Sequence, residues 1–145
     1  MSPGEVDVAL VRRHLLALDR ALAVLRRHQG RSVAQLEQDP EELWAVERGL
    51  QLCAQNVIDV ATHVAVSAGC EVQDYARAID RLGELGVLTR EFAARFRSVA
   101  GFRNVLVHAY LEVDVRHVHR LLNEQLEDFA EFARSIEGRL GRAGR

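Results

Sequence analysis

The stretch RNVLVHAY, residues 103–110, places four chemically capable side chains within eight positions. Arg103 carries a permanent positive charge that can stabilise an anionic oxygen. The imidazole of His108, which titrates at about 6.5 when unperturbed, can accept or donate a proton at neutral pH. Asn104 and Tyr110 add an amide and a phenol. These residue types suit a catalytic site, although buried, hydrogen-bonded polar residues would explain them equally well.

Helix geometry sets a condition on this stretch. Asn104 and His108 are four residues apart and share a helix face, whereas Arg103 and His108 are separated by about 140° around the axis. His108 and Tyr110 would point to nearly opposite sides if the helix continued. The following AYLEVD leads to a new N-cap at Asp114, which favours a helix end just past Tyr110. Arg103, His108 and Tyr110 can therefore act together only if the helix ends near His108, or if a second subunit completes the site.

The elements that position this stretch are predicted to be helices. Apolar residues recur three or four positions apart over residues 8–25 and again over 43–64, which is the spacing of a buried helix face. The first of these helices is broken at Gly30 and the second ends near Gly69. Asp39 is a good N-cap for the second helix, and the proline after it suits the first helical position. We expect two long antiparallel helices joined by a loop of about ten residues.

The remaining chain predicts shorter helices of the same kind. One spans about residues 74–85, and Thr89 caps another that runs into the 103–110 stretch. Asp114 caps the last, whose apolar stripe reaches Ile136. The Gly- and Arg-rich segment 138–145 is expected to fray. The sequence thus predicts an all-α, up-and-down bundle of four to five helices.

Length and composition fit one globular domain over residues 1–145, with 48% hydrophobic and 28% charged residues. The net charge of −2 gives no evidence of nucleic-acid binding. All 19 Lys and Arg residues are arginine, so every one of these cations can bind phosphate through two hydrogen bonds. Five arginines make the first helix and its exit basic, which is either a solvated face or a patch for RNA phosphate: Arg12, Arg13, Arg26, Arg27 and Arg31.

The cysteines and the hydropathy pattern narrow the cellular setting. Cys53 and Cys70 are far apart and lack a CxxC partner, so we expect reduced thiols in a cytoplasmic protein, with Cys53 buried. No stretch approaches the ~20 apolar residues of a membrane span.

Asp59 and His63 are four apart and could pair. Neither HExxH nor ExxH occurs, and we expect no metal ligands or cofactor.

The second long helix also carries a polar ridge, made of Glu47, Arg48, Gln51, Asn56 and Asp59. Such a ridge suits a wall of a polar cleft or the polar rim of a dimer, and spacing alone does not choose between them. The apolar faces of the two long helices are persistent for so small a chain. A symmetric dimer that buries part of them is therefore a second interpretation beside a plain core.

The stretch RNVLVHAY resembles the Arg-x4-His-x-Tyr motif of the HEPN superfamily, and it is most similar to the small HepT-like toxins. The preceding FRSVAGF and the following VD add to the likeness, which extends over nearly the whole chain. The resemblance implies an all-α homodimer that cleaves RNA without a metal, with Arg103 and His108 as catalytic residues and Tyr110 as a third motif residue. Asn104 matches a polar residue often found after the arginine.

In this superfamily the two motifs face each other across the dimer, which would resolve the angular separation of Arg103 and His108. It would also place Glu47 and Asp59 near the cleft as supporting residues. The resemblance further implies a type VII-like toxin–antitoxin system. Its antitoxin is an MNT-type nucleotidyltransferase that transfers AMP onto the motif tyrosine, here Tyr110. The added anion beside Arg103 would exclude RNA phosphate.

Two other classes remain open from the residues. One is a non-catalytic helical subunit that binds a nucleotide or acts as the scaffold of a split nucleotidyltransferase. The other is a bare helical dimerisation domain. An intact set of Arg103, His108 and Tyr110 favours the ribonuclease, because a scaffold has no need of all three.

Overall fold

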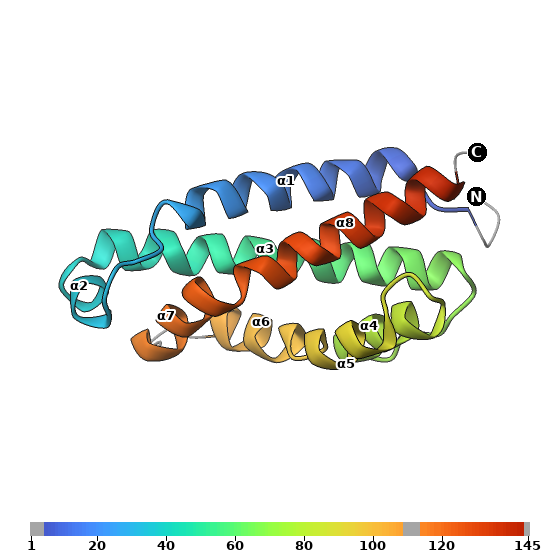
Figure 1. The fold of residues 1–145 in the computed structure, drawn as a ribbon. Helices are drawn as coiled ribbons and strands as arrows, with labels where there is room; N and C mark the ends of the chain where they lie inside the picture. The colour runs from blue at the N-terminus through green and yellow to red at the C-terminus, as the bar shows by residue number, and fades with distance from the viewer. Residues whose placement is uncertain (1–4, 109–113, 144–145) are drawn as a thin grey trace.

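In the computed structural model the backbone is described for residues 5–108 and 114–143, and side chains for 5–104 and 114–141. Every regular element within these ranges is an α-helix, which confirms the predicted all-α fold (Figure 1). The described helices are α1 (Val8–Arg26), α2 (Val33–Gln38), α3 (Pro40–Ser67), α4 (Tyr75–Glu84), α5 (Arg90–Phe96), α6 (Val99–His108), α7 (Val115–Glu124) and α8 (Leu126–Ala143). The described ranges hold eight helices, so the predicted number of four to five was too low.

Local sequence signals account for most helix ends. The predicted N-caps Asp39, Thr89 and Asp114 each accept a hydrogen bond from a backbone N–H of the first turn, at 3.0–3.1 Å. Gly30 and Gly69 adopt φ angles of 89° and 84°, a conformation that favours glycine and ends the preceding helix. These boundaries were therefore readable from residue types alone.

Three additional breaks raise the number of helices. The predicted loop between the long helices contains α2, which begins with a capping box at Ser32 and Gln35. The predicted fourth helix is divided into α5 and α6 near Ser98, whose hydroxyl donates to the Arg95 carbonyl at 3.3 Å. The predicted fifth helix is divided into α7 and α8 at Gln125.

The C-terminal segment 138–145, expected to fray, is helical as far as Ala143. Leu140 within it is buried against the core, which explains why the helix continues. Residues 144–145 lie outside the described part of the chain.

The helices form an up-and-down bundle in which α3 is the central element (Figure 1). α1 runs antiparallel to α3 along its length, α8 returns beside α1, and α6 runs antiparallel to α3 on the opposite side from α1. The short α4 and α5 connect the end of α3 to α6. Among the described helices, none combines the length and the apolar character that crossing a bilayer requires.

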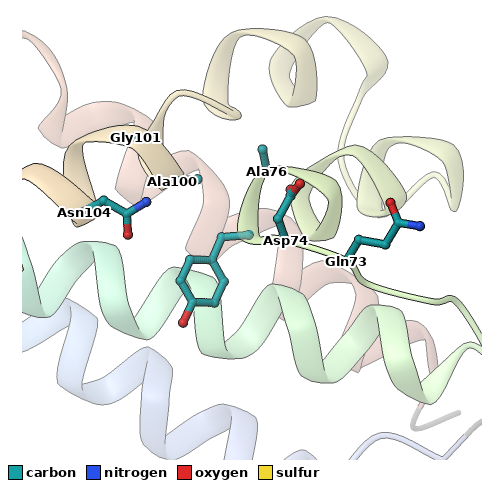
Figure 2. A pocket seen from close by; sticks show the side chains of 7 residues that line it. Gln73, Asp74, Ala76, Ala100, Gly101 and Asn104 are labelled. Atoms are coloured by element: carbon teal, nitrogen blue, oxygen red, sulfur yellow. The ribbon is translucent and has the colours of Figure 1, made fainter.

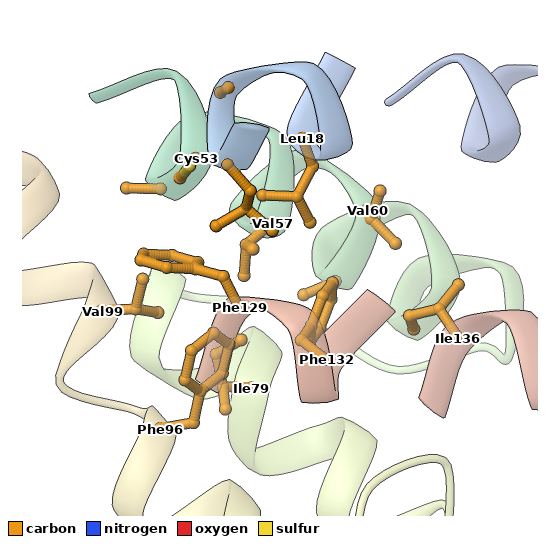
Figure 3. Packing of buried hydrophobic residues seen from close by; sticks show 14 of the residues in the cluster. Leu18, Cys53, Val57, Val60, Ile79, Phe96, Val99, Phe129, Phe132 and Ile136 are labelled. Atoms are coloured by element: carbon orange, nitrogen blue, oxygen red, sulfur yellow. The ribbon is translucent and has the colours of Figure 1, made fainter. Parts of the chain in front are cut away.

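The core is apolar and continuous, and it also anchors the helix that carries the motif (Figure 3). Phe96 stacks on Phe132 with ring centroids 5.6 Å apart, and it meets Phe129 edge-on at 5.8 Å. The buried Phe102 of α6 meets Phe129 edge-on at 5.9 Å. Cys53 lies in this core, and burial raises the pKa of its thiol to about 12. The buried ring of Phe102 therefore fixes the orientation of α6 next to Arg103.

Candidate functional site

Arg103 is half-buried and is held by side chains from three helices. Its Nε donates to Oε1 of Gln55 on α3 at 3.0 Å, and its Nη1 donates to Oδ1 of Asn104 at 3.1 Å. Its guanidinium carbon lies 5.2 Å from the ring centroid of Tyr75, the first residue of α4, which is a cation–π distance. The charged group is thus oriented by an amide on either side and by an aromatic ring.

Gln55 extends this network along α3. Its Nε2 donates to Oδ1 of Asp59 at 2.8 Å, while its Oε1 accepts from Arg103. Only this amide orientation satisfies both neighbours, since a guanidinium cannot accept and a carboxylate cannot donate. The structure therefore connects Asp59, one of the two predicted supporting acids, to Arg103 through a neutral side chain.

The other predicted residues lie further along the same helix pair. Arg103 lies beside Gln55 of α3, and His108 lies five residues later on α6, about 7.5 Å further along the helix axis. Because α6 runs antiparallel to α3, this step leads toward Gln51 on α3. Glu47 lies two turns before Gln55, about 12 Å along α3. It is half-buried, and burial raises the pKa of its carboxyl above the ordinary value. The side chain of His108 and the whole of Tyr110 lie outside the described residues.

A pocket of about 560 Å³ opens beside Arg103, between α6 and the start of α4. Figure 2 shows Asn104 of α6 at one end of the pocket and Asp74 and Gln73, which precede α4, toward the other end. The pocket is lined by Gln73, Asp74, Tyr75, Ala76, Ala100, Gly101 and Asn104. Two members of the Arg103 environment, Tyr75 and Asn104, are therefore also walls of this pocket.

Sequence reasoning missed both Gln55 and Tyr75. Gln55 was detectable, because it stands four residues after Gln51 and four before Asp59 on the same ridge of α3. No sequence signal connected Tyr75 to Arg103, since the two are separated by most of α4, α5 and the start of α6.

Asp59 and His63, which helix spacing allows to pair, have other partners. Asp59 accepts from Gln55, and Nε2 of His63 accepts from the backbone N–H of Asp7 at 2.9 Å. His63 thereby holds the N-terminal end of α1 against α3 and belongs to the scaffold. Across the described residues, the side chains of His, Cys, Asp and Glu nowhere gather in threes as ligands for a metal ion.

The Arg-rich end of α1 is partly neutralised by acids. Arg26 lies 3.4 Å from Glu127, and Nε of Arg31 donates to Glu42 at 2.7 Å. The hydrogen bonds from His28 and then from Arg31 hold the pKa of the Glu42 carboxyl below its ordinary value. Arg26 and Arg31 are therefore paired within the protein, and the choice between a solvated face and an RNA-phosphate patch stays a prediction.

The fold and this arrangement define a helical bundle with a supported arginine in the middle of the short helix α6. The sequence pattern described as "Ribonuclease HepT-like" matches residues 18–136, and the chain belongs to that family, which confirms the predicted resemblance. It is similar to a tRNA nuclease HepT of Aphanizomenon flos-aquae, 26% identical over 137 residues that span 93% of this chain and 92% of the relative. It is also similar to an mRNA nuclease HepT of Shewanella oneidensis, 27% identical over 68% of this chain and 75% of the relative.

Solved structures share the fold. A toxin–antitoxin with AMP-PNP superimposes with a TM-score of 0.79, at 22% identity over 90% of this chain and 98% of that one. A tri-AMPylated HEPN toxin of Shewanella oneidensis in complex with an MNT antitoxin superimposes with a TM-score of 0.78, at 23% identity over 88% of this chain and 96% of that one. A cytosolic protein of unknown function, YutE from Bacillus subtilis, superimposes with a TM-score of 0.81, at 19% identity over 95% of this chain and 93% of that one. At these identities the likeness establishes the HEPN-type fold.

Proposed function

We propose that this protein is the toxin of a type VII-like toxin–antitoxin system and an endoribonuclease that needs no metal ion. Arg103 and His108 from two copies of the chain form one composite site across a homodimer, with Asn104, Glu47 and Asp59 in support. The observation that carries the proposal is the fixed orientation of the Arg103 guanidinium by Gln55, Asn104 and Tyr75. The nuclease names of the two HepT relatives support the reaction class.

The arginine is suited to a phosphodiester. A guanidinium carries five N–H groups, and the bonds to Gln55 and Asn104 use two of them. The others can bind phosphoryl oxygens, where a preoriented charge stabilises the transition state more than the ground state. Arg103 therefore acts as the charge that stabilises the phosphorane.

His108 supplies the proton transfers. The imidazole of one protomer removes the proton from the ribose 2′-OH, the 2′ oxygen attacks phosphorus, and the bond from phosphorus to the 5′ oxygen breaks. The imidazolium of the second protomer gives its proton to the departing 5′ oxygen. The products are a 2′,3′-cyclic phosphate and a 5′-hydroxyl, with no water or metal consumed.

An apolar surface next to the site supports the dimer. Leu52, one turn before Gln55 on α3, and Val24 on α1 are partly exposed. They line a groove of about 400 Å³ between the two helices. A second copy seated there would bury these apolar residues. We place the enzyme in the cytoplasm, where thiols such as Cys53 stay reduced.

Tyr110 is proposed as the target of an MNT-type nucleotidyltransferase antitoxin. The phenol oxygen attacks the α-phosphorus of ATP, AMP is transferred and pyrophosphate leaves. The new phosphodiester adds a negative charge and bulk within the motif, which competes with RNA phosphate for Arg103. The AMPylated HEPN toxin among the structural neighbours supports this regulation. Co-expression with the antitoxin should add one adenylyl mass per modified site, absent from Tyr110→Phe.

The test of the nuclease is expression of the wild type, Arg103→Ala and His108→Ala, with Arg134→Ala as the matched control. Arg134 is an exposed arginine on α8, so its loss should change neither folding nor activity. We expect growth arrest and RNA cleavage from the wild type and Arg134→Ala only, with cleavage unchanged by EDTA. Full cleavage by folded His108→Ala would refute the assignment. Nucleotide binding without cleavage by the wild type would instead favour a scaffold subunit.

A further inference from the structure

The pocket beside Arg103 combines an aromatic ring with hydrogen-bonding groups. Tyr75 is 37% exposed and lies within cation–π distance of the half-buried Arg103. Asn104 and Gln73 present side-chain amides that can both donate and accept. The volume of about 560 Å³ falls in the range of small-ligand sites. These are the features of a site for a flat, polar, heterocyclic group.

The charges favour a base over a phosphate inside this pocket. Asp74 lines it, and one of its carboxylate oxygens accepts from the N–H of Arg77 at 2.8 Å as the N-cap of α4. A carboxylate on the wall repels a phosphate but accepts hydrogen bonds from the amino groups of bases. The positive charge sits instead on Arg103, whose guanidinium carbon lies over the ring of Tyr75, 5.2 Å from its centroid, so a base has to stack on the remaining exposed part of that ring. The pocket is thus suited to the base of a nucleotide, and Arg103 to its phosphate.

We infer that this pocket binds an unpaired nucleobase next to the scissile phosphodiester of RNA, with the base stacked on Tyr75 and its amino or carbonyl groups bonded to Asn104 and Gln73. Because the ring centroid of Tyr75 is 5.2 Å from the guanidinium carbon, a base on Tyr75 and its adjoining phosphate on Arg103 can be bound together. This assignment rests on the proposed ribonuclease function. It restricts the substrate to single-stranded RNA or loops, since a paired base cannot enter.

The test measures binding separately from cleavage. The probe is a fluorescein-labelled 2′-O-methyl oligoadenylate, which lacks the nucleophile, together with an abasic ribose-phosphate oligomer of the same length. Fluorescence anisotropy at one fixed salt concentration gives Kd for the full-length wild type, Tyr75→Ala and Tyr75→Phe. Tyr75 is exposed at the first position of α4, so both variants should keep the wild-type Tm. Trp44→Ala, which removes a 65% exposed ring from the other end of α3, is the control.

We expect Tyr75→Ala to weaken oligoadenylate binding about 5- to 160-fold, the usual range for one base–aromatic stack, and Tyr75→Phe and Trp44→Ala to bind like the wild type. On the abasic oligomer, Tyr75→Ala should bind only about 2- to 5-fold more weakly than the wild type, the part that comes from its cation–π contact with Arg103. An equal loss on both oligomers would show that Tyr75 only positions Arg103 and would overturn the base site, as would unchanged binding to oligoadenylate. Cleavage of unmodified RNA is scored separately, so a wild type that binds as expected but never cuts refutes the nuclease and leaves the base site standing.

Discussion

Replacing Gln55 with leucine tests whether the neutral link in α3 positions the catalytic arginine. Leucine keeps a similar volume but removes two hydrogen bonds. One runs from Nε of Arg103 to Oε1 of Gln55 at 3.0 Å, and the other from Nε2 of Gln55 to Oδ1 of Asp59 at 2.8 Å. A hydrogen bond to a charged group contributes about 1.5–3 kcal/mol. If that energy serves to orient Arg103 in the transition state, kcat/KM should fall about 10- to 160-fold.

The assay is single-turnover cleavage of an RNA oligonucleotide by the wild type, Gln55→Leu, Arg103→Ala and the double variant. Because Gln55 acts through Arg103, the leucine substitution should have no further effect once the arginine is absent. Unfolding in urea is measured in parallel, where the loss of the hydrogen bond to the Asp59 carboxylate should lower the free energy of unfolding by about 1.5–3 kcal/mol.

Asn56→Leu provides the matched control on the same helix. Its Oδ1 bonds to Nδ1 of His14 on α1 at 2.8 Å, so its loss should cost similar stability without altering cleavage. Full activity of Gln55→Leu, or an effect that adds undiminished to that of Arg103→Ala, would refute the positioning role. A loss of activity in Asn56→Leu equal to that in Gln55→Leu would show that general destabilisation of α3 is responsible.

Three further predictions concern packing at Gly83 and the pH dependence of stability at Glu42 and Glu47. A Cβ at Gly83 would lie 2.8 Å from the Cβ of Ala93 and would force α4 and α5 apart, whereas one at Gly138 meets nothing within 4 Å. Calorimetry should therefore find Gly83→Ala less stable than Gly138→Ala by about 1–3 kcal/mol, and equal values would contradict the tight contact. The hydrogen bond with His28 is the largest cause of the lowered pKa of Glu42. The Glu42 carboxylate therefore stabilises the fold above its unfolded pKa, and this stabilisation is lost as the pH falls through its folded pKa. Glu42→Gln should accordingly lower Tm at pH 7, and this difference from the wild type should shrink as the pH falls below 4.5. Burial raises the pKa of Glu47, so its charged form is disfavoured in the folded state and Glu47→Gln should raise Tm at pH 7; a lowered Tm there would overturn the sign.

The helix pattern was predictable because its signals are local. Asp39, Thr89 and Asp114 each bond to an N–H two or three residues onward, so residue types in a short window are sufficient to find them. The helix α2 had such a signal in Ser32 and Gln35, but the absence of an apolar stripe over six residues hid it. The break near Ser98 was not predictable from the stripe, because Phe96 and Val99 keep helical spacing across it.

The candidate site divides in the same way. Spacing alone established that Arg103 and His108 lie on different helix faces, and the motif likeness alone named the family. What surrounds Arg103 depends on the antiparallel packing of α6 on α3 and on the approach of α4, contacts that join residues tens of positions apart. Gln55 and Tyr75 meet the guanidinium only through that packing, because the buried rings of the core set the rotation of each helix. The sequence by itself therefore determined the helices, the motif and the family. The partners of the arginine and the pocket beside it were decided by the tertiary structure, since no local rule specifies which faces of distant helices meet.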